Sequence, residues 1–346
     1  MKFHITIYLT LILHLSPVPL DYATQPDIEI SFVCVGDIML AGSAAPVIER
    51  KGVDYPFNGT CHITQTADVA IGNLEMPIAT GGEPIPEKAY TFRGPPSLAK
   101  GLANAGFDVL SLANNHMGDY GDDALLETLE ILIANQIGYC GAGIDLDSAR
   151  EPAAMEVKGK QIAVLAYANT FPFEFFAGEG DPGTTRGKPE FFVPDIKAAK
   201  QWADLVIVSF HWGGELVTEP RDYQEAFGRR AIDLGADLVF GHHPHVLQGV
   251  EVYKGKLIAY SLGNFVFGSY SKNAKTSVIL QVTFQEQGRI RAELIPINVF
   301  NHEVSFQPQV LTGEAAEAVL EEVRVLSEKW GTQITTEENL GVIQMQ

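Results

Sequence analysis

The sequence predicts an α/β protein in which a pair of mixed β-sheets is flanked by helices. Strand-like and helix-like patterns alternate through most of the chain, which is typical of parallel strands joined by helical crossovers. Several short apolar runs end abruptly in polar residues, as the buried strands of such sheets do. In the second half, pairs of strand-like runs separated by short turns predict antiparallel hairpins.

Five apolar runs are expected to form the parallel strands, at residues 30–35, 67–71, 107–112, 204–210 and 237–240. Helices are expected at 96–105, 122–136 and 221–234. Leucine and isoleucine recur at helical spacing in 122–136, and the other two segments stop at a glycine, the residue favoured just past a helix end.

Three hairpins are expected, at 153–157 with 161–167, 246–253 with 257–261, and 276–284 with 290–297. A last helix is expected at 314–330. The stretch 171–192 is dense in phenylalanine, glycine and proline and predicts a long loop. Such a loop is either a lid or recognition element, or a packed surface flap.

Composition and net charge limit the kinds of partner that this chain is expected to bind. The chain has 346 residues, of which 46% are hydrophobic, enough for a sizeable core. Its net charge of −19 argues against binding nucleic acid or an anionic membrane surface through a basic face. The three cysteines give neither a disulfide framework nor a cysteine-based zinc site.

Residues 1–26 have the layout of a secretory signal peptide, with a basic start, a short apolar core and a proline-containing end. An uncleaved N-terminal membrane anchor and a misassigned start codon are the alternatives. Export predicts a periplasmic or extracellular protein. We expect one functional domain at 27–300 and a C-terminal extension with a helix at 301–346.

Residues that bind metals follow each expected parallel strand. Because the carboxyl ends of parallel strands meet at one edge of an α/β sheet, these residues are expected to gather in one crevice. The alternative for the histidine run is a polar loop with three solvated imidazoles. Mixed carboxylate, amide and imidazole donors suit Zn, Mn or Fe better than Ca or Mg alone. The residues are Asp37, Asn73 with Glu75, Asn115 with His116, His211, and the run His242, His243 and His245.

These residues stand in motifs whose order resembles the CapA family, which is tied to bacterial poly-γ-glutamate capsule synthesis and belongs to the metallophosphatase-like fold group. The resemblance covers roughly residues 28–268 and implies a four-layer α/β/β/α sandwich of the calcineurin-like metallophosphoesterase type, with two divalent metal ions. The motifs are Gly36-Asp37, Asn73-Leu74-Glu75, Phe92-Arg93-Gly94, Asn114-Asn115-His116, His211-Trp212-Gly213-Gly214-Glu215, His243-Pro244-His245 and Ser261-Leu262-Gly263-Asn264.

The resemblance also implies a role for each position. His116 matches the general acid that protonates a leaving group, and His242 is an extra residue beside the metal ligands. Asn73 and Asn264 are expected next to the metals. The metal ligands implied are Asp37, Glu75 as the bridging carboxylate, Asn115, His211, His243 and His245.

Three positions depart from the usual metallophosphatase pattern. Met39 stands where a histidine ligand follows the first aspartate, so one metal site is expected to be weak. Met117 stands where an aspartate orients the histidine, and Glu75 replaces a shorter aspartate.

Two further residues carry open alternatives. Arg93 could grip an anionic substrate with two hydrogen bonds or form an ordinary surface salt bridge. Glu215 could orient a metal-bound histidine or cap the segment that follows it.

The resemblance implies a function in the synthesis of poly-γ-glutamate or a related capsule polymer. The first hypothesis is a hydrolase in which metal-activated water attacks a phosphoester or an amide. The second is a non-catalytic assembly or export factor that keeps the fold, and the third is the same fold with no polymer role. The expected partners are an anionic polymer or the capsule synthase machinery.

Overall fold

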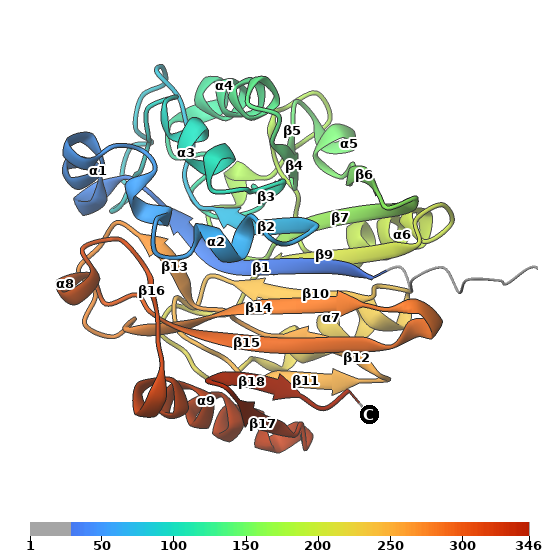
Figure 1. Cartoon of the computed structure of the whole chain (residues 1–346). Coiled ribbons are helices and arrows are strands. Elements are labelled where there is room, and N and C mark those ends of the chain that lie inside the picture. The colour runs from blue at the N-terminus through green and yellow to red at the C-terminus, as the bar shows by residue number, and fades with distance from the viewer. Residues whose placement is uncertain (1–28, 346) are drawn as a thin grey trace, which may run out of the picture.

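The computed structural model describes residues 29–345 and contains two β-sheets packed face to face, with helices on their outer faces (Figure 1). The ten-stranded sheet has the order β17 (Ile334–Glu337), β18 (Leu340–Ile343), β15 (Ile290–Asn298), β14 (Thr276–Phe284), β1 (Ile30–Met39), β2 (Val69–Leu74), β3 (Val109–Ser111) and β4 (Gly138–Cys140). Two short strands join it at the side, β13 (Asn264–Phe267) on β1 and β16 (Gln309–Val310) on β15.

The six-stranded sheet has the order β11 (Val250–Tyr253), β12 (Lys256–Ala259), β10 (Leu238–His242), β9 (Leu205–His211), β7 (Lys160–Ala168) and β6 (Ala153–Val157). A small pair, β5 (Ala142–Gly143) and β8 (Gly183–Thr184), lies apart from both sheets. Pairing is parallel among β1, β2, β3 and β4, and among β7, β9, β10 and β12.

The helices cover opposite faces of this sandwich. α1 (Ala45–Lys51), α2 (Cys61–Thr64), α3 (Leu98–Asn104) and α4 (Gly121–Ala134) lie over the ten-stranded sheet, and α6 (Pro189–Ala199) and α7 (Asp222–Asp233) over the six-stranded one. α9 (Gly313–Ser327) packs against strands of both sheets, β15 and β11. Shorter elements are α5 (Leu146–Ala149), α8 (Asn301–Val304) and the 3-10 turns Gly42–Ala44, Tyr55–Phe57, Phe173–Phe175, Glu286–Gly288 and Glu328–Trp330.

Alternation along β1 explains why the sheets stack in four layers. Phe32 and Cys34 point into the apolar core between the two sheets. Val33 and Val35 belong to the core under the outer helices. Because successive side chains of a strand point to opposite faces, a strand that is apolar at every position is covered on both sides.

The predicted fold class is therefore confirmed, and the five parallel strands and three hairpins are present. The loop expected at 171–192 is shorter than predicted because α6 begins at Pro189. Proline normally breaks a helix, and α6 also contains Pro194, but Phe192 and Ile196 bury one face of it against the six-stranded sheet. The hairpin of β17 and β18 was not predicted.

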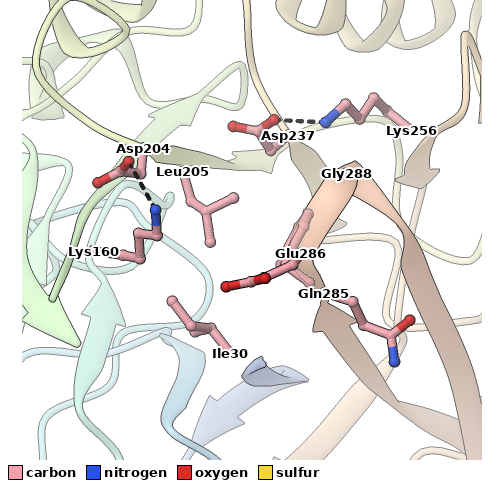
Figure 2. Close-up of a pocket in the computed structure, with 10 residues that line it drawn as sticks. Ile30, Lys160, Asp204, Leu205, Asp237, Lys256, Gln285, Glu286 and Gly288 are labelled. Carbon is pink, nitrogen blue, oxygen red and sulfur yellow. Dashed lines mark hydrogen bonds and ion pairs between the residues drawn. The ribbon is translucent and has the colours of Figure 1, made fainter. Parts of the chain in front are cut away.

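Carboxylates close the amino ends of the parallel strands. The backbone N–H of Ser31 donates to Asp68 Oδ2 at 2.9 Å, and that of Ala70 to Asp108 Oδ2 at 2.8 Å. In the other sheet, the N–H of Val206 donates to Asp237 Oδ2 at 3.0 Å. Each aspartate thus satisfies the first exposed donor of a neighbouring strand. A pocket of about 430 Å³ lies at this end. Asp237 and Lys256, which line it, form an ion pair (Figure 2).

The division into a domain at 27–300 and an extension at 301–346 stays a prediction. In the structure β16 and β18 both pair with β15, so the C-terminal residues continue the ten-stranded sheet. The predicted signal peptide or anchor at 1–26 lies outside the described residues. Within residues 29–345, no helix is long and apolar enough to cross a membrane.

Candidate metal centre

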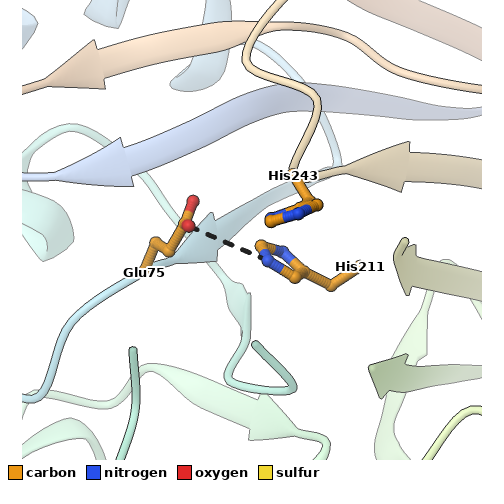
Figure 3. A group of neighbouring side chains, drawn as sticks. All are labelled: Glu75, His211 and His243. Carbon is orange, nitrogen blue, oxygen red and sulfur yellow. Dashed lines mark ion pairs between the residues drawn. The ribbon is translucent and has the colours of Figure 1, made fainter. Parts of the chain in front are cut away.

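The carboxyl ends of the parallel strands bring the predicted ligands together. Asp37 lies on β1, Glu75 directly follows β2, and His211 is the last residue of β9. His243 comes one residue after β10, facing Glu75 and His211 (Figure 3). Ligand atoms of Glu75, His211 and His243 all lie within 4.8 Å of one another, and the three residues are buried. This spacing allows one cation to contact all three.

Two more groups of possible ligands adjoin the first. Asp37, Glu75 and His245 form one, and Glu215, His243 and His245 form the other, each with ligand atoms within 4.8 Å. Glu75, His243 and His245 each belong to two of the three groups. A pair of neighbouring cation positions that share Glu75 is compatible with this arrangement.

Hydrogen bonds fix the orientation of the ligand side chains. Asn115 Oδ1 lies 2.7 Å from His211 Nε2. His245 Nδ1 lies 3.0 Å from Asp37 Oδ2 and 3.0 Å from Asn264 Oδ1, so this nitrogen carries the proton that both oxygens accept. His245 Nε2 lies 3.9 Å from Glu75 Oε1, where it can bind a metal once it has given up its proton.

Buried atoms without partners mark the centre of the cluster. Among the described residues, Glu75 Oε1 and His243 Nδ1 are buried and accept no hydrogen bond. A buried polar atom left unpaired costs about 1–3 kcal/mol, and such atoms call for an explanation, for example an ion. Carboxylate, amide and imidazole donors in this number suit a divalent metal, so these residues fit the cofactor that the sequence predicts.

Burial and neighbouring charges set the protonation of the cluster without metal. Burial lowers the pKa of His243 to about 3, and burial also holds the pKa of His211 well below its usual range. Both imidazoles are therefore neutral at pH 7, the form that binds metals. Burial, with the negative charge of Asp37, raises the pKa of Glu75 well above its usual range.

The pKa values of the other two ionisable ligands, Asp37 and His245, depend on each other. Burial favours neutral His245, but the charge of Glu75 and the hydrogen bond that His245 donates to Asp37 outweigh it and raise the pKa of His245 to about 9. Burial likewise opposes ionised Asp37, and its contacts with His242 and His245 outweigh burial and hold the pKa of Asp37 well below its usual range. A metal cation that binds here would displace the proton of His245 and would neutralise the nearby carboxylates in its place.

The backbone around the ligands is tightly constrained. His243 and His245 have positive φ values of 93° and 58°, which non-glycine residues adopt rarely and which cluster at functional sites. Gly36, just before Asp37, packs so closely on the neighbouring chain that an added Cβ would lie 1.9 Å from the carbonyl oxygen of Gly263. The aspartate can therefore reach the centre only because a glycine precedes it.

An aspartate orients His116, although the sequence analysis found methionine at the usual place. Asp119 is fully buried, and its Oδ2 lies 2.7 Å from His116 Nδ1. Because a carboxylate only accepts, Nδ1 carries the proton, and Nε2 is the ring nitrogen left for reaction. Burial outweighs the attraction of Asp119, so the pKa of His116 is lowered.

Lys88 supports the same aspartate and was also missed. Its Nζ pairs with Asp119 Oδ1, donates to the main-chain carbonyl of Asn115 at 2.7 Å, and lies 3.1 Å from His116 Nδ1. The position of Asp119, three residues after His116 on one turn, was a usable sequence signal. No local signal pointed to Lys88, because it comes from a separate segment of the chain.

The predicted supporting residues differ in how close they lie to the cluster. Asn73 Nδ2 donates to Asp37 Oδ1 at 2.9 Å, and lies 3.5 Å from Glu75 Oε2. His242 is fully buried with Nδ1 at 3.2 Å from Asp37 Oδ1, though without good hydrogen-bond geometry. Glu215 is exposed at the rim, where its carboxylate belongs to a group with His243 and His245.

Two residues lie away from the cluster. Arg93 Nη1 donates to the carbonyl oxygens of Gly81 and Gly82, and its guanidinium lies 4.4 Å from the centre of the Tyr120 ring. The two alternatives for Arg93, a grip on an anionic substrate and a surface salt bridge, both stay predictions. Met39 is fully buried in the core under the outer helices. Its side chain packs there and supplies no metal ligand in place of the missing histidine.

Comparisons with known proteins agree with this geometry. A family model described as "Bacterial capsule synthesis protein PGA_cap" matches residues 31–269. The PGA biosynthesis protein CapA of Bacillus subtilis is 36% identical over 287 residues, covering 82% of this chain and 75% of that protein. The capsule biosynthesis protein CapA of Bacillus anthracis is 33% identical, covering 78% and 68%.

Among solved structures, the NAD nucleotidase NadN of Haemophilus influenzae has a TM-score of 0.50 at 14% identity, covering 86% of this chain and 63% of that one. At this identity the likeness concerns the fold alone. It agrees with the predicted metallophosphoesterase type of sandwich.

Proposed function

Since this chain belongs to the bacterial capsule synthesis family PGA_cap, we propose that it is an exported, metal-dependent hydrolase that cleaves a phosphoester during synthesis of poly-γ-glutamate or a related polymer. The observation that carries the proposal is Glu75, whose buried Oε1 has no partner and faces two groups of ligands. A bound divalent metal explains such an atom, whereas a site without metal leaves its burial uncompensated.

Each residue has a defined part in the proposed reaction. Asp37 and His245 would hold one divalent ion, Asn115, His211 and His243 a second, and Glu75 both. Zn, Mn and Fe are the metals that suit this donor set. When bound, such ions lower the pKa of water and neutralise negative charge on the phosphoryl group. In its protonated form, His116 would donate the Nε2 proton to the leaving oxygen and then regain a proton from solvent water, while Asp119 accepts from Nδ1–H and holds the ring in position.

The test is metal analysis and hydrolysis by the purified protein and by Glu75→Gln. We expect the wild type to bind a divalent metal and to cleave generic phosphomonoesters or phosphodiesters, and Glu75→Gln to lose both properties. Glu293→Gln is the matched control, because Glu293 is a buried glutamate far from the cluster in β15. Absence of metal and of turnover in the wild type contradicts the proposal, and cleavage of γ-glutamyl amides instead of phosphoesters corrects its substrate class.

A second candidate function is a non-catalytic assembly or export factor for the capsule. Met39 favours it, because one expected histidine ligand is missing from the cluster. Full restoration of capsule in a deletion strain by Asn115→Ala or His243→Ala would support this candidate. Loss of capsule with a folded variant protein supports the hydrolase.

Export rests on residues 1–26, and N-terminal sequencing of the protein from the native host tests it. We expect a mature chain that begins near residue 27 or an intact N-terminus in the membrane fraction. Recovery of the intact chain from the cytoplasm contradicts export.

A further inference from the structure

A pocket of about 290 Å³ opens beside the metal centre. His116 and His245 form its floor, so the pocket adjoins both the proposed proton donor and a proposed metal ligand. A group that leaves the phosphorus and takes its proton from His116 must lie next to His116. The pocket is therefore the place where the leaving group sits.

The walls of this pocket are largely aromatic and apolar. Tyr90, Phe92, Leu216 and Phe267 line it. The Phe92 ring lies 4.9 Å from the ring of His116, and the Phe267 ring lies 4.5 Å from that of His245. Tyr90 is 72% exposed, so its ring has no partner of comparable size on its outer side. Flat rings placed in this way bind a flat apolar group by burial and stacking.

The charges around the pocket oppose an anionic leaving group. Of the described residues that line it, none is lysine or arginine, and Glu215 adds a carboxylate. The ammonium of Lys88, which contacts His116, already pairs with Asp119 and donates to the carbonyl of Asn115. A polymer of glutamate units would bring one carboxylate per residue into a pocket whose lining has no lysine or arginine to pair with it.

The aromatic wall is fixed to the catalytic loop. The N–H of Phe92 donates to Asp119 Oδ2 at 2.7 Å, and the N–H of Ile85 donates to the carbonyl of Asp119 at 2.9 Å. Lys88, between them, pairs with the same residue. The segment from Ile85 to Phe92 is thus held at three points by Asp119, which also orients His116. The wall and the proton donor keep a constant relation to each other.

We propose that the pocket is a leaving-group subsite that selects an uncharged group with a flat apolar face, and that a polyanionic chain is excluded from it. This inference rests on the proposed phosphoesterase function. It narrows the substrate class to phosphoesters whose leaving group is neutral, such as aryl or other planar apolar alcohols.

Binding of three non-hydrolysable phosphonates to the Mn²⁺-loaded protein tests the proposal by calorimetry. Methylphosphonate reports the metal centre alone, benzylphosphonate adds a flat apolar ring, and phosphonoacetate adds a carboxylate. We expect benzylphosphonate to bind about tenfold more tightly than methylphosphonate, from partial burial of the ring. Phosphonoacetate is expected to bind no more tightly than methylphosphonate.

The variant Tyr90→Ala isolates the aromatic wall. Because Tyr90 is largely exposed, its loss should leave the fold and methylphosphonate binding intact while removing most of the benzylphosphonate advantage. Trp202→Ala, which removes another exposed aromatic ring at a different pocket, is the control and should keep the advantage.

Two results overturn the subsite alone: phosphonoacetate binding at least as tightly as benzylphosphonate, or an unchanged advantage in Tyr90→Ala. If Mn²⁺ binds but none of the phosphonates does, the proposed phosphoesterase function fails, and the subsite fails with it.

Discussion

Acidic side chains lie at both ends of the parallel strands, but their roles at the two ends differ. At the amino ends, Asp68, Asp108 and Asp237 accept backbone N–H groups of neighbouring strands, and lysines pair with Asp68 and Asp237. At the carboxyl ends, Asp37 and Glu75 face histidines and each other across a buried centre. The carboxylates at the amino ends have hydrogen-bond partners within the fold, whereas at the carboxyl ends Glu75 Oε1 has none.

This difference shows how a structural carboxylate is told from a functional one. A carboxylate that completes backbone hydrogen bonds lowers the free energy of the folded chain without any ligand. A buried carboxylate beside another raises that free energy until a cation arrives. Substitutions at the two ends should therefore change different quantities.

The largest effect is expected for Asp37→Asn at the carboxyl ends. Loss of a charged ligand should remove metal binding and reduce hydrolysis on the order of a thousandfold, because the metals supply several kcal/mol of charge stabilisation. Metal content and initial rates measure both. Full metal occupancy in a folded Asp37→Asn protein would contradict the functional role assigned to the carboxylates at the carboxyl ends.

Lys88→Met tests a residue at the carboxyl ends that contacts no metal ligand side chain. Hydrolysis should fall about ten- to a hundredfold, because Asp119 loses its cation and the loop that carries His116 loses a tether. Metal content should stay at the wild-type level, as measured by emission spectroscopy. Lys100→Met, on the outer helix α3, serves as the control with no expected effect. Metal loss in Lys88→Met would place Lys88 among the residues that build the metal centre itself.

Asp237→Asn tests the amino ends. Its carboxylate accepts the N–H of Val206 and pairs with Lys200 and Lys256, so the free energy of unfolding should fall by about 1–3 kcal/mol. Urea unfolding measures this change. Metal content and specific activity of the folded fraction should not change, and a selective loss of activity would contradict a purely structural role.

The smallest expected effect is the pH-dependent contribution of Asp68 to the free energy of unfolding. Burial opposes ionised Asp68, but Lys158 and the donors of Ser31 outweigh it and lower the pKa of Asp68. A carboxylate whose pKa is lower in the folded than in the unfolded state stabilises the fold above its unfolded pKa of about 3.9 and loses this contribution as the pH falls. Because Asp68 is partly exposed, solvent screening should limit the contribution to a few tenths of a kcal/mol. The free energy of unfolding, measured as a function of pH, should be higher for the wild type than for Asp68→Asn near neutral pH, and this difference should disappear below about pH 4. A difference that stays the same at every pH would show that ionised Asp68 contributes nothing.

Much of the fold could be predicted because buried strands leave a simple pattern. Strands such as β1 and β9, apolar on both faces, stand out from their neighbours, and each carries a polar residue at or near its carboxyl end. α6 was missed because its prolines resemble a loop, and its helical state depends on packing against the six-stranded sheet. Local sequence carries little information on such tertiary support.

The sequence by itself determined the strands, the chemical type of the ligands and the family motifs, since periodicity and strand ends are local properties of the chain. Only the tertiary structure decided which polar residues meet. It brought Asp119 and Lys88 to His116, turned Arg93 toward the carbonyls of Gly81 and Gly82, and buried Met39 under the helices. The physical reason is that the energy of a polar side chain depends on its partners and burial, and both arise from segments distant in sequence.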